Sequence, residues 1–255
     1  MLKKLIRLHI SDLWLCLGVV AGLFLIVNGI IAAVLLLSEG TSSVPLPSGV
    51  ALPIAVGIMT LAVTVSHVSI SFVQALQFGQ SRRRALGLML SLVLLEGGCS
   101  MALAAALTWV ERTLFPALWL VLSGKEQLVW GGIPPIPAPA PWDGSNQEWA
   151  ALLDEISSTL YLQDVSLDWW WFPVILLIGL AAGFIVGACL QRFGSKGGWI
   201  LWCVWMAICF APQLLPLDDL SLPLPPDFLL YVAVVLAAGM LIWSVWSLLH
   251  AVVKH

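Results

Sequence analysis

The sequence predicts an all-α polytopic membrane protein with six transmembrane helices and both termini in the cytoplasm. Of its 255 residues, 60% are hydrophobic and only 10% are charged, and the mean hydropathy is +1.01. A soluble domain of this length would have too little polar surface to cover it. Several apolar runs reach the ~20 residues needed to cross ~30 Å of hydrocarbon. We therefore treat residues 1–255 as a single transmembrane domain.

The N-terminal part, residues 13–110, should hold the first three helices, at about 13–37, 50–76 and 86–110. Before them, residues 1–12 alternate basic and apolar side chains, which favours an amphipathic helix on the inner membrane surface. A positively charged tail is the simpler interpretation of the same pattern. The first apolar run is too long for a signal peptide and is expected to remain as a span.

A short polar loop, Gln77 to Ala85, separates the second and third spans and carries three consecutive arginines, at 82–84. Cationic clusters in short loops mark the cytoplasmic side of a membrane protein. The loop is at least a topology signal. It is also a candidate docking element for a cytosolic partner.

Residues 111–168 form a long segment that is expected to lie outside the cytoplasm. Its first apolar piece, Leu114 to Leu122, contains Pro116 and is too short to cross, so it should lie in the outer interface. Five prolines between 134 and 141 favour polyproline II. Ser145 and Glu148 make a capping box, and apolar residues then recur at helical spacing, which predicts an external helix over about 146–162.

The C-terminal part, residues 169–255, should hold helices four to six, at about 169–190, 199–215 and 228–249. A short inner loop, 191–198, joins the first two of these. The charge distribution supports this layout, because nine of the eleven Lys and Arg fall at the predicted inner face. A seven-span count would move Arg192 and Lys196 outside and break the positive-inside rule. Twelve of the fourteen acids lie in predicted outer segments.

No sequence motif for catalysis is present. There is no G-x-x-x-x-G-K-[ST] phosphate loop and no H-E-x-x-H zinc motif, and the five cysteines have no metal-ligand spacing. We therefore do not expect an enzyme, a metal site or a cofactor in this chain.

Polar residues recur in the second span at intervals of 4, 3, 4 and 3, which places them on one face of an α-helix. They are Thr60, Thr64, His67, Ser71 and Gln74. A polar stripe in a span should face protein or water rather than lipid. Hydrogen bonding between helices and one wall of a translocation path both fit the pattern.

Glu96 is the one carboxylate deep within a predicted span. His67 lies at the same depth on the preceding span, so the two side chains are expected to lie within reach of each other. An ionisable group inside a membrane is expensive and usually paired. The alternative is a protonated Glu96, and the pair could serve either packing or substrate contact.

The fourth span contains two overlapping G-x-x-x-G units, formed by Gly179, Gly183 and Gly187. Small residues at this spacing allow two helix backbones to approach closely. The partner helix could belong to this chain or to a second copy.

The basic start, the six spans and the loop F-G-x-S-R-R resemble a type-2 ATP-binding-cassette (ABC) permease, the membrane subunit of an exporter. The loop resembles the first coupling helix of that family, formed here by Phe78, Gly79, Ser81, Arg82, Arg83 and Arg84. In that family this helix docks on a separate cytosolic ATPase, which binds the ATP and Mg. Residues 3–12 resemble the family's connecting helix and 191–198 its second inner loop.

The resemblance implies two cytosolic ABC ATPase subunits, a second permease copy or homologue, contact with membrane lipid and no nucleic-acid partner. It also implies a multi-pass protein of the cytoplasmic membrane of a bacterium. The apolar, Trp-rich composition suggests an amphipathic or hydrophobic cargo such as a peptide, drug or lipid. The alternatives are a proton-coupled secondary transporter, with Glu96 and His67 as the relay, and a non-transporting immunity or sensor subunit.

Overall fold

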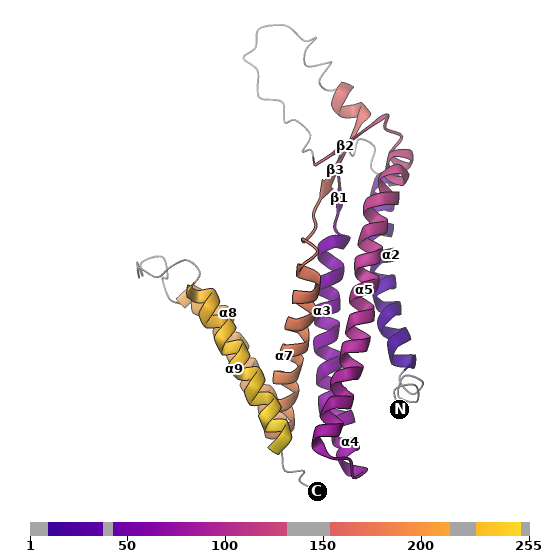
Figure 1. Ribbon diagram of the computed structural model, residues 1–255. Coiled ribbons are helices and arrows are strands. Elements are labelled where there is room, and N and C mark those ends of the chain that lie inside the picture. The colour runs from indigo at the N-terminus through magenta and orange to yellow at the C-terminus, as the bar shows by residue number, and fades with distance from the viewer. Residues whose placement is uncertain (1–9, 38–42, 132–153, 215–227, 251–255) are drawn as a thin grey trace. The chain divides into compact units, whose positions relative to one another are not determined.

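Within the part of the chain that the structure describes, four helices are long and apolar enough to span a bilayer, which makes this a helical membrane protein. They are α2 (Ile10–Leu37), the continuous helix Ser48–Gln77, α5 (Arg82–Ser123) and α7 (Trp171–Phe193). The computed structural model describes residues 10–37, 43–131, 154–214 and 228–250 (Figure 1). Two further helices follow, α8 (Ser195–Leu214) and α9 (Phe228–His250). The six-span count and the side on which each terminus lies stay predictions.

Some predicted segments lie outside the described residues. These are most of the N-terminal amphipathic helix, the proline-rich run and the loop before residue 228. The chain divides by its contacts into two compact units, and each is described by itself. The first comprises Met1–Val56 and Gly98–Ile175, and the second Gly57–Gly97 and Leu176–His255.

The first unit contains a small parallel sheet, which the all-α prediction missed. Its strands are β1 (Ser43–Leu46), β2 (Gln127–Trp130) and β3 (Thr159–Asp164), in the order β1-β3-β2. Val44 is paired with Leu162, and Val129 with Tyr161. The central strand therefore joins segments that are more than 100 and about 30 residues away in sequence.

The sheet packs against α2 and the end of α5, as Figure 1 shows (indigo and magenta helices). The buried residues of this core are Ile31, Leu35, Val44, Leu46, Trp119, Leu160 and Leu162. Phe115 makes edge contacts with both Phe24 and Trp119, at ring-centroid distances of 5.5 and 5.2 Å. Arg112 pairs with Asp164 at 2.8 Å, which ties the end of β3 to α5.

The apolar piece Leu114 to Leu122 was predicted to be separate, and that prediction is wrong. It is the continuation of α5, which runs unbroken for 42 residues through Pro116. At 1.5 Å per residue this helix is ~63 Å long, about twice the thickness of the hydrocarbon core. The helix continues because Phe115 and Trp119 have apolar partners on the sheet and on α2.

The external helix predicted over 146–162 is wrong in its C-terminal part. Residues 154–158 are helical, but β3 begins at Thr159, and residues 132–153 lie outside the described part of the chain. Four successive residues, Thr159 to Leu162, are buried. A run buried on both faces suits a central strand, whereas an amphipathic surface helix would expose at least one residue in every turn.

The second unit is built on a helix that changes its geometry part-way. α3 (Ser48–Ser66) continues into a π-helical turn, η1 (His67–Ser71), and then into α4 (Phe72–Gln77). Side chains from this helix, α5, α7 and α9 form one buried cluster: Val68, Phe72, Ala85, Met89, Val93, Leu180, Phe184, Ala188 and Leu248. Arg192 of α7 lies over the Trp243 ring of α9, 5.6 Å from its centroid.

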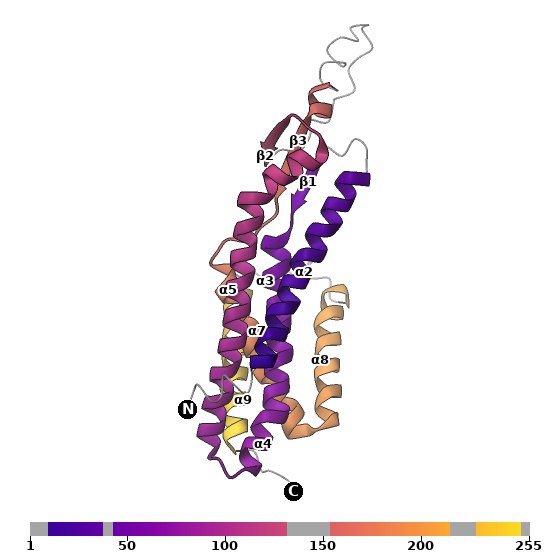
Figure 2. The ribbon, with the colours of Figure 1, turned by 90° about the vertical axis from the view of Figure 1, so that its right-hand side faces the viewer.

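The inner loop predicted at 191–198 is almost entirely helical, so that prediction is wrong in extent. Only Gly194 interrupts the helices, and the chain reverses there between α7 and α8 (Figure 2). Gly194 has a φ of 60°, and its N–H donates to the carbonyl of Leu190 at 2.8 Å. This left-handed glycine terminates α7 and lets α8 begin at the next residue.

Candidate functional site

The turn between α4 and α5 is a compact Schellman motif that presents Phe78. The N–H of Gly79 donates to the carbonyl of Leu76, and that of Gln80 to the carbonyl of Ala75, at 3.0 and 3.1 Å. These are the two hydrogen bonds that define the motif, and Gly79 supplies the required positive φ of 76°. The Phe78 side chain is 85% exposed. The turn therefore holds an aromatic ring outward on a backbone with few free dihedrals.

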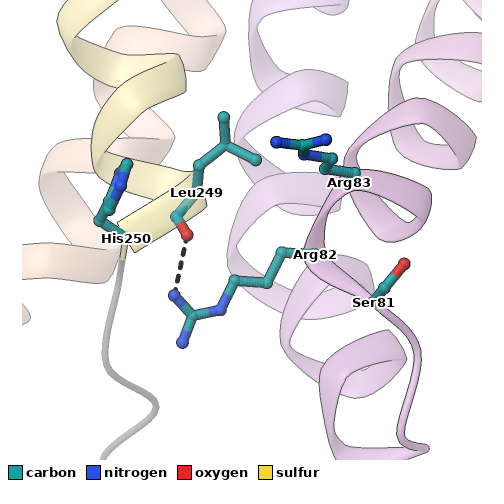
Figure 3. A pocket seen from close by; sticks show the side chains of 5 residues that line it. All are labelled: Ser81, Arg82, Arg83, Leu249 and His250. Atoms are coloured by element: carbon teal, nitrogen blue, oxygen red, sulfur yellow. Dashed lines mark hydrogen bonds between the residues drawn. The ribbon is translucent and has the colours of Figure 1, made fainter.

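The three arginines, predicted to lie in the loop, form the first turn of α5 instead. Positive charges oppose the helix dipole at an N-terminus, so this placement needs compensation. The guanidinium of Arg82 donates to the Leu249 carbonyl at 2.8 Å, at the C-terminal end of α9. In Figure 3, Arg82 and Arg83 both reach toward α9, on either side of Leu249, while Ser81 points away.

A hollow of about 410 Å³ lies between the start of α5 and the end of α9. Its lining residues are Ser81, Arg82, Arg83, Leu249 and His250 (Figure 3). Two of them are always cationic and none is a carboxylate. Arg83 has no hydrogen bond or ion pair within the described part of the chain. The hollow can therefore attract an anion.

His67 and Glu96 are in direct contact, as their equal depth predicts. Nε2 of His67 lies 3.1 Å from Oε2 of Glu96, and Nδ1 lies 3.0 Å from the Ser71 hydroxyl. An ionised Glu96 can only accept, and Nε2 then carries the proton of this contact, whereas a protonated Glu96 would donate to Nε2. With Glu96 ionised, Nδ1 accepts from Ser71 in the neutral ring and donates to it in the imidazolium. The three side chains can pass a proton along one hydrogen-bonded chain.

The polar stripe does not keep one face over its whole length, so that prediction is wrong at its inner end. Thr60, Thr64 and His67 are buried, but Gln74 is exposed. The π-turn inserts extra rotation: the Phe72 N–H donates to the His67 carbonyl, five residues back. Phe72 therefore takes the buried position that a regular α-helix would give to Ser71.

Two buried oxygens beside the pair have no hydrogen-bond partner within the described residues. They are Oε1 of Glu96 and Oγ1 of Thr60. Glu96 is 1% exposed. A buried acceptor without a donor is costly and often occurs at functional positions. The buried group formed by Thr60, Thr64, His67 and Glu96 therefore has two oxygen atoms that can take part in a further hydrogen bond, whether the group serves packing or transport.

The glycine stripe of α7 packs within this chain. A Cβ at Gly179 would lie 2.4 Å from the carbonyl oxygen of Gly57, and one at Gly183 would lie 2.5 Å from Cβ of Thr64. A Cβ at Gly187 would lie 2.7 Å from Cβ of Val68. The glycines therefore let α7 approach α3 and η1 almost backbone to backbone, beside the buried polar group.

A second buried polar group, in the first unit, was not predicted from the sequence. Glu111 is 0% exposed and accepts from Ser48 twice, from the backbone N–H at 3.2 Å and the hydroxyl at 2.6 Å. The Asn28 side chain lies close to the same carboxylate. Glu111 thus caps the N-terminus of α3 from another helix. The signal in the sequence was a serine opening an apolar run, but its partner lies 63 residues away.

Among the described residues, no group of three or more His, Cys, Asp or Glu is placed to hold a metal ion. Comparisons with protein-family models, with curated proteins and with solved structures find no match for this chain.

Proposed function

We propose that this chain is the membrane-spanning permease subunit of an ATP-driven ABC exporter. The observation that carries the proposal is Phe78, an exposed aromatic ring held by a rigid turn directly before three arginines. An aromatic beside guanidinium groups has the composition of an interface anchor. Separate cytosolic ATPase subunits would bind the turn that carries Phe78, bind ATP and Mg, and supply the energy.

In this proposal six spans cross the cytoplasmic membrane of a bacterium, with both termini inside. A second permease copy or a homologue completes the transport path. The cargo is amphipathic or hydrophobic: a peptide, a drug or a lipid. The Schellman turn lets a push on Phe78 act on α4 and α5 together, because few dihedrals in the turn can absorb it. The π-turn directly before α4 is a natural place for the helix to yield.

Phe78→Ala tests the docking role. The variant should insert normally, because the arginines that fix topology remain, yet it should lose most of its recovery in complex with the ATPase and its cargo-stimulated ATP hydrolysis. Trp130→Ala is the matched control, since Trp130 is an exposed aromatic in the predicted outer segment. Full ATPase coupling in the Phe78→Ala protein would reject the docking role and leave the arginines as a topology signal.

A proton-coupled secondary transporter is the second candidate, favoured by the Ser71–His67–Glu96 hydrogen-bonded chain. The two functions separate in proteoliposomes that contain only this chain. Uptake driven by a pH gradient, and lost in Glu96→Gln, would support the secondary transporter. Transport that appears only with an ATPase subunit and ATP would support the exporter.

A further inference from the structure

We propose that the hollow at the start of α5 binds the phosphate group of an anionic phospholipid, whose acyl chains lie along one face of α9. This proposal goes beyond the exporter function and does not depend on it. Both proposals use the arginines at the start of α5, but this one also uses His250 and the face of α9, whereas the docking proposal is tested at Phe78.

The charges of the hollow favour an anion. Arg82 is engaged with the Leu249 carbonyl, but its fork has further N–H donors, and Arg83 has no partner within the described residues. The positive end of the α5 dipole adds to the charge of these two arginines, whereas the last carbonyls of α9 oppose it. The Leu249 carbonyl is already occupied by Arg82, and the lining holds two guanidinium groups and no carboxylate, so the hollow favours a phosphate over an ammonium group. Its volume of about 410 Å³ falls within the ~300–1,000 Å³ typical of small-ligand sites.

A hydrogen bond within α9 determines which ring nitrogen of His250 is left for a ligand in the hollow. Nδ1 of His250 lies 2.9 Å from the Trp246 carbonyl, which only accepts, so Nδ1 carries a proton. Nε2 therefore donates to a phosphate oxygen when the ring is protonated. The imidazole ring also lies against the Trp246 ring, tilted by 33° at a centroid distance of 4.8 Å.

The apolar surface next to the hollow indicates a lipid rather than free phosphate. Residues four apart lie on one face of a helix, and Ile242, Trp246 and His250 have this spacing on α9. Ile242 is 69% exposed and Trp246 is 52% exposed. The face of α9 formed by Ile242, Trp246 and His250 therefore leads from an apolar surface to the basic hollow. Basic pockets between helices on the cytoplasmic side are recognised sites for anionic head groups.

The first test measures lipid binding to the delipidated full-length protein by native mass spectrometry. Phosphatidylglycerol should bind the wild type about fivefold to tenfold more tightly than it binds Arg83→Gln, given ~1 kcal/mol or somewhat more per arginine. Arg84→Gln is the matched control, because it removes the same charge from the next residue, which does not line the hollow. It should stay within about twofold of wild type. Equal losses in the two variants would overturn the site. So would equal wild-type binding of phosphatidylcholine.

The second test separates the sources of phosphate. Glycerol phosphate and inorganic phosphate, at millimolar concentration, should fail to displace phosphatidylglycerol. Trp246→Ala should lower the affinity for this lipid several-fold. Trp205→Ala is the control, because Trp205 is an exposed tryptophan on α8, and it should leave the affinity unchanged. Displacement by soluble phosphate, with no effect of Trp246→Ala, would overturn the lipid assignment.

The third test uses the wild-type protein, so it does not depend on whether Arg83→Gln folds. A phosphatidylglycerol with a photoreactive acyl chain should label the peptide that contains Ile242 and Trp246, and the phosphatidylcholine analogue should not. Label spread evenly over the apolar helices would contradict the proposal. The rival occupant of the hollow is an acidic protein. Such a partner, added to the protein in phosphatidylcholine nanodiscs, would prevent the modification of Arg83 by phenylglyoxal. That protection, without lipid selectivity, would also overturn it.

Discussion

The imidazole of His67 is hydrogen-bonded on both sides, to Glu96 at 3.1 Å and to Ser71 at 3.0 Å. Glu96 lies on α5, which follows the Phe78–Ser81 turn, so the contact closes a helical hairpin near its middle. Pairing offsets the large cost of an ionisable group in a span. The same contact thus holds the hairpin together and places a proton-transfer chain within it.

Glu96→Ala should destabilise the protein more than Glu96→Gln. Alanine leaves Nε2 of His67 buried without an acceptor, which typically costs about 3–5 kcal/mol for a broken buried pair. Glutamine keeps an oxygen at the same place and should cost about 1 kcal/mol. Unfolding in mixed micelles, followed by circular dichroism, measures both.

Glu155→Ala is the control for that series, because Glu155 is an exposed acid and should change the free energy of unfolding by less than about 0.5 kcal/mol. If Glu96→Ala proved as stable as Glu155→Ala, the His67–Glu96 pair would carry no structural role, and its burial would need a functional explanation.

Gly179→Ala should separate α7 from α3. The added methyl group would lie 2.4 Å from the Gly57 carbonyl oxygen, a backbone atom that cannot rotate away. Overpacking of this kind costs typically about 1–3 kcal/mol. The thermal midpoint in detergent should fall accordingly.

Gly87→Ala provides the opposite outcome on a neighbouring helix. Gly87 lies in α5, and no atom lies within 4 Å of the position that an alanine methyl group would take there. Alanine should therefore be neutral or raise stability by up to about 1 kcal/mol. Equal losses at Gly179 and Gly87 would show that the α7 glycines are not a packing stripe.

The spans could be predicted because a membrane helix is encoded locally. α2, Ser48–Gln77 and α7 follow the apolar runs to within a few residues, since run length alone decides whether a helix can cross. The His67–Glu96 contact was also predictable, from equal depth on two helices joined by a short turn. The docking and transport roles of these residues stay predictions.

What could not be predicted depends on distant parts of the chain. Strand β1 has four residues including Pro45, and it exists because it pairs with β3, more than 100 residues later. Leu160 fits an amphipathic helix as well as a strand until its neighbours are known. The π-turn at His67 moves the buried face by one residue, and the spacing of Thr60, Thr64 and His67 does not predict this turn.

Glu111→Ala should destabilise the first unit. It would leave the N–H and hydroxyl of Ser48 without their acceptor in a buried place, at about 1–3 kcal/mol for each unsatisfied group. Ser48→Ala removes the hydroxyl and keeps the backbone donor, so it should cost less. Hydrogen exchange at the first turn of α3 should rise in both variants.

Glu126→Ala is the matched control, because Glu126 is an exposed acid beside β2. Exchange at α3 should be unchanged in it. A Glu111→Ala protein with wild-type exchange at Val50 and Ala51 would show that α3 does not need this cap.

Cysteine labelling tests the predicted topology directly. In a variant whose five native cysteines are replaced by alanine, Val129→Cys should react with an impermeant maleimide added outside intact cells, because β2 follows α5 beyond the length that a bilayer can enclose. Ser81→Cys and Lys196→Cys should react only in inside-out vesicles, because the arginines mark that face. All three positions are exposed, so access is decided by sidedness alone. Labelling of Lys196→Cys from outside would contradict six spans and require an additional crossing between α5 and α7.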